Sequence, residues 1–243
     1  MLPEDEEILE VFQRAKETDE KFAEKMHVWR RLYYHLRKVF LRCNLLPFGS
    51  TMTGFALQGS DLDIVILLPR NEFSSRVQVL EACERALVDS KDRHLSQFEL
   101  IDCRTPILVL QDTSGQSPLK IELSCGSPNL WDGTRNTHLL LSYSDLDPRV
   151  RRLVIVLKTW ADFHVLLGTR HKRLSGYSLA LMLLFYLQRT PIPVVPVLQR
   201  HYPNAFGHQV PVIEHLNYTF KVRMVDVLHF LLTVIFFCFC FSC

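Results

Sequence analysis

Two aspartates near the start of an apolar run are the residues whose types and spacing point most directly to chemistry. Asp61 and Asp63 are separated by one residue, and the run continues to Pro69. If residues 61–69 form a strand, its period of two places both carboxylates on one face. Two carboxylates this close repel each other, and a divalent cation relieves the repulsion. The pair therefore predicts a metal site of the kind that serves phosphoryl transfer with two metal ions.

A glycine–serine pair lies eleven residues earlier, in what we expect to be a turn after a short apolar run. Gly49 lets the backbone approach a phosphate closely, and the Ser50 hydroxyl with nearby backbone N–H groups can bind phosphate oxygens. Taken alone, an Asp-x-Asp pair is most often a solvated strand end, and a Gly-Ser pair is a weaker signal. Their joint appearance before an apolar strand is much more specific, and it closely resembles the DNA polymerase β-like nucleotidyltransferase superfamily.

That resemblance implies a third carboxylate on a neighbouring strand, and Glu122 is the candidate. A carboxylate in mid-strand among apolar neighbours is costly to leave unpaired. The other interpretation is that Glu122 points to solvent from the polar face of an alternating strand. Relatives normally carry Asp here, and Glu keeps the charge and the donor oxygens but adds one methylene. By the resemblance, Asp61, Asp63 and Glu122 are the catalytic residues and the ligands of Mg²⁺ or Mn²⁺.

Three further segments follow in the family's order and narrow the resemblance to the cytoplasmic, germline-type poly(A) polymerases and terminal uridylyltransferases. These segments are residues 135–143, 147–161 and 174–187. The resemblance covers about residues 25–220, and it implies ATP as the substrate nucleotide, with UTP as the alternative.

The same resemblance assigns nucleotide-binding roles to side chains downstream of the carboxylates. It implies that Asn136 contacts the sugar or base, that Lys158 binds the triphosphate, and that Tyr177 stacks on the base. Ser175 supplies the nearest remaining hydroxyl. In isolation, Lys158 is equally typical of a surface lysine with a buried stem, and Tyr177 of a core tyrosine. Relatives carry a second lysine four residues after Lys158, and Lys172 is the candidate substitute here.

The wider hydrophobic pattern predicts an α+β chain in which these residues are positioned by a mixed, partly antiparallel sheet between helices. Apolar residues at three- and four-residue steps indicate a long helix, or two in series, over residues 4–43. Further helices are expected over 74–89, 146–167, 175–188 and 197–201, and further strands over 98–103, 106–111 and 119–124, the last two forming a hairpin.

We expect a nucleotidyltransferase palm over residues 45–136, packed against a helical domain. The helical domain would comprise residues 1–44 and 137–220, and it is expected to be incomplete because the family's helical domain continues further. The expected reaction is attack of an RNA 3′-hydroxyl on the α-phosphate of ATP with release of pyrophosphate. The alternatives are a terminal uridylyltransferase, or a truncated, catalytically inactive form that binds RNA or protein.

Composition and charge limit the class of protein. Of 243 residues, 48% are hydrophobic and 22% charged, which excludes a disordered or fibrous chain. A net charge of +2 excludes a strongly basic nucleic-acid binder but allows a local basic groove. We therefore expect an RNA 3′ end as substrate, weak intrinsic RNA affinity and an RNA-binding recruiter protein. We also expect the protein to be a monomer. Because no secretory signal is visible, we expect it in the cytoplasm, or alternatively the nucleus, with its cysteines as free thiols.

Residues 221–243 form an atypical apolar tail with three interpretations. The first is a membrane anchor, but the uninterrupted stretch from Phe230 has fourteen residues, fewer than the roughly 20 that span a bilayer. The second is a buried helix, which the lack of polar residues disfavours. The third, which we favour, is translated intron, because such runs of Phe, Cys, Ser and Leu can be encoded by pyrimidine-rich tracts. We therefore expect no membrane association, and no zinc site at Cys240–Cys243, since no second CxxC follows.

Overall fold

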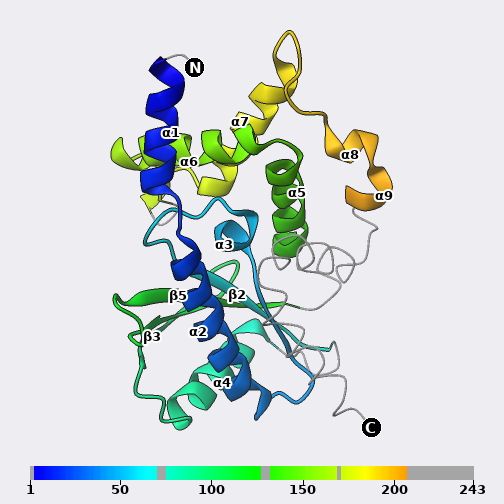
Figure 1. Cartoon of the computed structure of the whole chain (residues 1–243). Helices are drawn as coiled ribbons and strands as arrows, with labels where there is room; N and C mark the ends of the chain where they lie inside the picture. The colour runs from blue at the N-terminus through cyan, green and yellow to red at the C-terminus, as the bar shows by residue number, and fades with distance from the viewer. Residues whose placement is uncertain (1–2, 70–74, 127–131, 169–170, 207–243) are drawn as a thin grey trace.

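A five-stranded mixed sheet organises the lower half of the molecule in Figure 1. The computed structural model describes residues 3–69, 75–126, 132–168 and 171–206. The strand order is β1-β2-β5-β4-β3, and β2 runs parallel to β5 while the other neighbours are antiparallel. The strands are β1 (Asn44–Pro47), β2 (Leu62–Leu67), β3 (Leu95–Ile101), β4 (Ile107–Asp112) and β5 (Leu119–Gly126).

Two helices, α2 and α4, cover one face of this sheet. Leu62, Ile64 and Ile66 point to that face from β2, and the odd-numbered residues of β5 from Ile121 onward do the same. Because side chains alternate along a strand, the odd residues of β2 and the even residues of β5 lie on the opposite face. The Trp29 indole N–H of α2 donates to the Leu45 carbonyl at 3.0 Å, which fixes α2 to the edge strand. The helices are α1 (Pro3–Ala15), α2 (Asp19–Arg37), α3 (Gly49–Thr53), α4 (Arg76–Asp89), α5 (Asp132–Leu146), α6 (Pro148–Phe163), α7 (Gly176–Arg189), α8 (Leu198–His201) and α9 (Pro203–Phe206).

A second hydrophobic core joins α5, α6 and α7 in the upper half of Figure 1, with α1 packed against α6. Phe55, from the loop between α3 and β2, is buried in this helical core and so connects it to the sheet. Asp147 caps α6 by accepting from the Arg149 N–H at 2.8 Å, and Pro148 starts the helix with a φ that suits its first turn. Ser175 caps α7 in the same way, through the Ser178 N–H at 2.9 Å.

These elements confirm the expected α+β class, the four expected strands as β2, β3, β4 and β5, and the hairpin of β4 with β5, whereas the edge strand β1 was not expected. The N-terminal unit is two helices in series, separated at Lys16–Thr18. At Gly49 the chain turns from the extended Phe48 directly into the short helix α3, with a φ of +70° at the glycine. Residues 207–220 and the apolar tail at 221–243 lie outside the described part of the chain. None of the helices described is long and apolar enough to cross a bilayer.

We predict that Tyr143→Phe destabilises the helical core. The buried Tyr143 hydroxyl accepts hydrogen bonds from the Leu198 N–H at 3.0 Å and from Gln188 Nε2 at 2.8 Å. The substitution leaves the buried Leu198 N–H unpaired, which costs about 1–3 kcal/mol of unfolding free energy. Urea unfolding would measure the loss, with Tyr34→Phe on the exposed side of α2 as a control that changes stability by less than about 0.5 kcal/mol. Equal effects of the two substitutions would contradict this role for Tyr143.

Candidate active site

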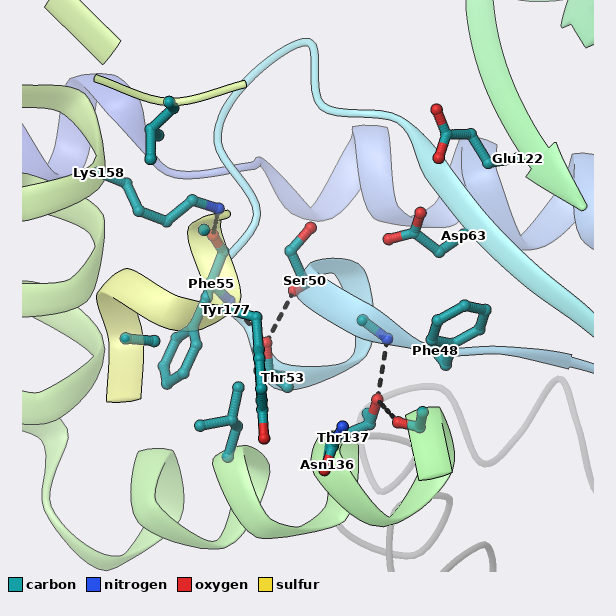
Figure 2. A pocket seen from close by; sticks show the side chains of 16 residues that line it. Phe48, Ser50, Thr53, Phe55, Asp63, Glu122, Asn136, Thr137, Lys158 and Tyr177 are labelled. Atoms are coloured by element: carbon teal, nitrogen blue, oxygen red, sulfur yellow. Dashed lines mark hydrogen bonds between the residues drawn. The ribbon is translucent and has the colours of Figure 1, made fainter. Parts of the chain in front are cut away.

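A cavity of about 500 Å³ lies between the helical core and the face of the sheet opposite α2 and α4. That volume is within the range of small-molecule sites. Its walls come from α3, β2, β5, α5, α6 and α7, so residues far apart in the sequence meet in it (Figure 2). Seven of the ten residues that the sequence singles out line this cavity: Gly49, Ser50, Asp63, Glu122, Asn136, Lys158 and Tyr177.

The pairing of β2 with β5 brings two carboxylates together. Asp63 and Glu122 are register partners in this parallel pair, on the sheet face that α2 and α4 leave uncovered. Both side chains point into the same open space (Figure 2). Asp61 precedes Asp63 by two residues at the start of β2, but it is not among the residues that line the cavity.

This arrangement makes ionisation of Asp63 costly. Loss of solvent raises its pKa from 3.8 to about 7, and the negative charges of Glu122 and Asp61 add to the effect. The positive charges of Lys25 and Lys120 act in the opposite direction but do not offset it. A carboxyl group in this state is stabilised by a proton or by a metal cation.

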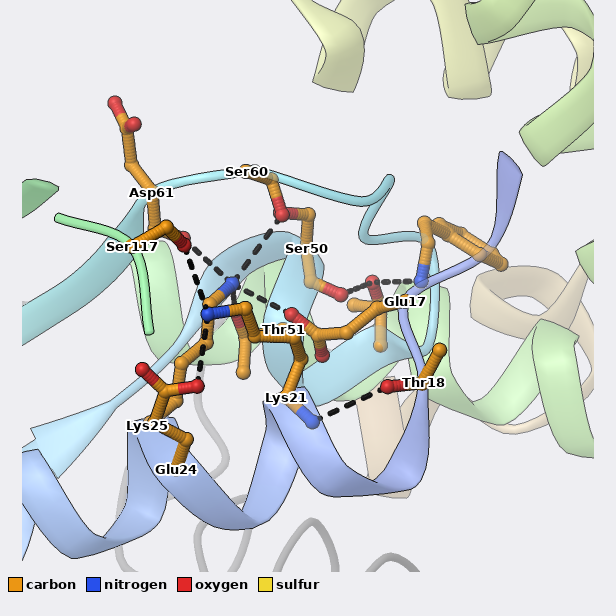
Figure 3. A network of polar contacts seen from close by, with 12 residues as sticks. Glu17, Thr18, Lys21, Glu24, Lys25, Ser50, Thr51, Ser60, Asp61 and Ser117 are labelled. Atoms are coloured by element: carbon orange, nitrogen blue, oxygen red, sulfur yellow. Dashed lines mark hydrogen bonds and ion pairs between the residues drawn. The ribbon is translucent and has the colours of Figure 1, made fainter. Parts of the chain in front are cut away.

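Lys25 is a buried cation below the carboxylates, and the sequence analysis did not identify it. Its Nζ forms an ion pair with Glu17 at 2.6 Å and donates to Thr51 Oγ1 at 3.1 Å. It also donates to Ser60 Oγ at 3.2 Å and to the Asp61 carbonyl at 3.1 Å (Figure 3). One ammonium group thus ties α2 to α3 and to the start of β2. A signal was available, since Lys25 falls on the buried face of α2 together with apolar side chains.

Lys120 is the second cation that the sequence analysis missed. It precedes Glu122 by two residues on the same face of β5, and its Nζ forms ion pairs with both Asp61 and Glu122. Within the described residues, no three His, Cys, Asp or Glu side chains are grouped closely enough to hold a metal ion. The donor chemistry nevertheless fits Mg²⁺ or Mn²⁺, because Asp61, Asp63 and Glu122 offer hard carboxylate oxygens and two of them already bind a cationic group.

Gly49 and Ser50 form the wall of the cavity next to Asp63. The Gly49 N–H donates to Thr137 Oγ1 of α5 at 2.9 Å, which holds α3 against that helix. A Cβ at position 49 would lie 2.5 Å from Asp63 Oδ2, and the φ of +70° is one that other residues rarely adopt. Glycine is therefore required here both for the backbone conformation and for the approach of the carboxylate.

The opposite wall carries the nitrogen donors and the aromatic ring. Lys158 Nζ donates to the Phe55 carbonyl at 2.7 Å, and loss of solvent lowers the pKa of this amine to about 8. Asn136 reaches the cavity from α5 and Tyr177 from the first turn of α7. A Cβ at Gly176 would lie 3.2 Å from Lys158 Cε, so glycine leaves room for the lysine stem.

Two of the expected nucleotide-binding residues do not line the cavity. Lys172 is exposed in the loop before α7, with a φ of +58°. The Ser175 hydroxyl is engaged as the cap of α7, where it also contacts the Ser178 hydroxyl at 2.8 Å. Their assignment therefore stays a prediction from the sequence resemblance.

Comparison with known proteins gives a consistent result. The family model for the mitochondrial-like poly(A) RNA polymerase central palm domain matches residues 5–145. The chain is 34% identical over 219 residues to the poly(A) RNA polymerase gld-2 homolog B of Drosophila melanogaster, covering 82% of this chain and 15% of that protein. It is 31% identical to the poly(A) RNA polymerase GLD2 of Danio rerio, covering 85% of this chain and 42% of that protein. The chain thus spans less than half of either curated relative.

Solved structures resemble the fold as well. The non-canonical poly(A) polymerase complex GLD-2–GLD-3 matches with a TM-score of 0.79 and 31% identity, over 88% of this chain and 67% of that chain. A mutant of the Cid1 poly(U) polymerase bound to MgATP matches with a TM-score of 0.70 and 27% identity, over 79% and 58% of the two chains. These likenesses confirm the expected palm fold, with the mixed sheet packed against helices.

We predict that Gly49→Ala perturbs the site more than the matched change Gly59→Ala. Both glycines have positive φ, but a Cβ at position 59 meets nothing within 4 Å. Gly59→Ala therefore carries only the backbone strain, about 1 kcal/mol, whereas Gly49→Ala also displaces the Asp63 carboxylate. Urea unfolding and Mn²⁺ titration of both variants would test this. Equal losses of stability together with unchanged Mn²⁺ affinity would contradict the close approach.

We further predict that Asp63→Asn stabilises the metal-free protein at pH 8. Because the pKa of Asp63 is raised to about 7 in the folded state, the folded protein binds the proton more tightly than the unfolded chain. Stability then falls as pH rises from about 4 to about 7, and Asn removes this loss. The expected increase in unfolding free energy is about 1–3 kcal/mol at pH 8 in EDTA, a range that allows for solvent screening of a half-buried group, and it decreases toward pH 4.

The matched control is Asp102→Asn, which removes an exposed carboxylate from the loop between β3 and β4. Urea unfolding of both variants between pH 4 and pH 8 would measure the difference. A gain for Asp63→Asn that does not change with pH would contradict the assignment.

Proposed function

Because the chain belongs, through residues 5–145, to the family of mitochondrial-like poly(A) RNA polymerase central palm domains, we propose that it adds AMP from ATP to RNA 3′ ends without a template. The observation that carries the proposal is the cavity in which Asp63 and Glu122 face Lys158, Asn136 and Tyr177. It combines carboxylates for metal, a cation for phosphate and an aromatic ring for a base within one space large enough for a nucleotide.

In the proposed reaction the RNA 3′-oxygen attacks the α-phosphorus of ATP, a new phosphodiester bond forms, and the bond to pyrophosphate breaks. Bound Mg²⁺ or Mn²⁺ supplies the charge that offsets the triphosphate and favours loss of the 3′-hydroxyl proton. Asp61, Asp63 and Glu122 would hold these ions.

The remaining residues would bind and orient the nucleotide. The Ser50 hydroxyl and the Lys158 ammonium face the cavity and would bind phosphate oxygens, and Gly49 allows the phosphates to come close to the backbone. When an anionic phosphate meets Lys158, it favours the protonated amine, which burial alone disfavours. Asn136 would contact the sugar or base, and Tyr177 would stack on the base, an interaction worth about 1–3 kcal/mol.

The second candidate is a uridylyltransferase, because the Cid1 poly(U) polymerase shares the fold at 27% identity. ATP is favoured because the relatives at 31–34% identity are named poly(A) RNA polymerases. A recruiter protein is part of the proposal, since GLD-2 is known in complexes with GLD-3 and with RNP-8 and the net charge of this chain is only +2. Action in the cytoplasm stays a prediction from the resemblance.

Primer extension tests the proposed function. Purified chain, a 5′-labelled RNA and Mg²⁺ or Mn²⁺ would be combined with each nucleoside triphosphate in turn. We expect extension with ATP. In Asp63→Asn the rate of extension should fall on the order of a hundredfold or more, because the substitution removes a carboxylate charge that the proposed reaction uses to stabilise its transition state. Asp102→Asn, which leaves the cavity intact, should extend at the rate of the unmodified protein.

The other outcomes are equally informative. Extension chiefly with UTP would favour the uridylyltransferase. No extension with any nucleotide and either metal, from a folded protein, would overturn the proposed activity for this chain.

A further inference from the structure

The ion pairs of Lys120 occupy the outer side of the carboxylate cluster. We propose that Lys120 takes the place of a divalent cation between Asp61 and Glu122 in the metal-free protein and has to withdraw before a metal ion binds there. Lys120 is then a positioning residue that sets the affinity of the site for divalent cations. The inference rests on the proposed function only in taking these carboxylates as metal ligands.

Strand geometry places Lys120 at this point. Lys120 and Glu122 are two residues apart on β5 and so share a face, and Glu122 is the register partner of Asp63. On the neighbouring strand, Asp61 precedes Asp63 by two residues. Three acidic side chains and one basic side chain therefore lie next to one another across the two strands. The ammonium group donates to Asp61 Oδ2 and to Glu122 Oε1, and thereby uses one oxygen of each.

The lysine and a metal ion would compete for these oxygens. The ammonium group of Lys120 is a cation, and its hydrogen bonds to Asp61 Oδ2 and Glu122 Oε1 occupy oxygens that a metal ion would use. An ammonium group and a divalent cation a few ångströms apart repel each other strongly, so both cannot bind the same carboxylates. The metal therefore binds only the fraction of molecules in which Lys120 has left, and its apparent Kd rises accordingly.

Exposure shows which of the neighbouring cations is able to leave. The side chain of Lys120 is 32% exposed, and those of Asp61 and Glu122 are 36% and 27% exposed. Each ion pair this open to water is weak, so Lys120 can withdraw into solvent, although the two pairs together keep it bound in most molecules. The Lys25 side chain is only 3% exposed, and its ammonium group has four partners. Lys25 is thus a fixed charge, and Lys120 is the exchangeable one.

The test is Mn²⁺ binding by the whole chain, measured by isothermal titration calorimetry without RNA or nucleotide. We expect Lys120→Gln to lower the Mn²⁺ Kd about tenfold, which corresponds to about 1.4 kcal/mol. Lys120→Arg retains a cation and should stay within about threefold of the unmodified protein. Lys120→Met, which keeps an apolar stem on the strand, should reproduce the Gln result and serves if Lys120→Gln does not fold.

The matched control is Lys21→Gln, which removes the same charge from a position next to the turn before β5. Lys21 binds Glu24 at 2.8 Å and Ser117, in the turn before β5, at 3.1 Å, but it does not contact the carboxylate cluster. We expect its Mn²⁺ Kd to be unchanged. An equal decrease in Kd for Lys21→Gln and Lys120→Gln would show a general charge effect and overturn the proposal, as would an unchanged or weaker affinity in Lys120→Gln.

Asp63→Asn separates this inference from the proposed function. If Asp63→Asn abolishes Mn²⁺ binding while Lys120→Gln leaves the Kd unchanged, the role of Lys120 is wrong and the metal site stands. If Asp63→Asn binds Mn²⁺ as tightly as the unmodified protein does, the carboxylate site is wrong, and the proposed function and this inference fall together. Tighter binding in Lys120→Gln without RNA extension by the unmodified protein would support the role of Lys120 and count against the activity alone.

Discussion

The parallel pairing of β2 with β5 places Asp63 beside Glu122, and the repulsion between these two carboxylates is the constraint that the rest of the site has to meet. Partial removal from water makes the repulsion worse, because little solvent remains to screen it. Lysines from three different elements place positive charge near these carboxylates: Lys25 from α2, Lys120 from β5 and Lys158 from α6. Each contributes positive charge near the acids, and together they still leave the pKa of Asp63 at about 7.

The three lysines differ in how firmly they are held, and this difference assigns them different tasks. Lys25 is buried with four polar partners, so its charge is part of the framework. Lys158 faces the cavity, and its pKa is lowered to about 8 by loss of solvent, so an incoming anion strengthens its charge. Lys120 is partly exposed and bound only to the carboxylates, so a stronger cation can replace it. Under the proposed function, such a site would have its carboxylate charge partly offset before a metal ion and an anionic phosphate bind.

Local patterns in the sequence were sufficient to predict four of the five strands and the longer helices other than α5, but they did not predict the edge strand β1 or the short helices α3 and α9. The pairing of Asp63 with Glu122 required the family resemblance, because strand order is not encoded in hydrophobic periodicity. Lys25 was missed because its partners Thr51 and Ser60 are remote in sequence, although its place among the apolar positions of α2 was a sign of burial. The short helix α3 was not predicted because the turn into it depends on a φ of +70° at Gly49 and on contact with α5, which are both set by tertiary structure.

The loop after α3 couples the helical core to the geometry of the carboxylates. Three successive carbonyls of this loop accept hydrogen bonds from elements around the helical core: Gly54 from Arg151, Phe55 from Lys158 and Ala56 from the Glu17 N–H. Glu17 is also the ion-pair partner of Lys25, which binds the Asp61 carbonyl. The junction between α1 and α2, Lys158 and the backbone of Asp61 are thus connected within a few hydrogen bonds. A displacement of α6 therefore moves Lys158 together with the segment that leads into β2, so the nucleotide and metal sites proposed above would not be independent.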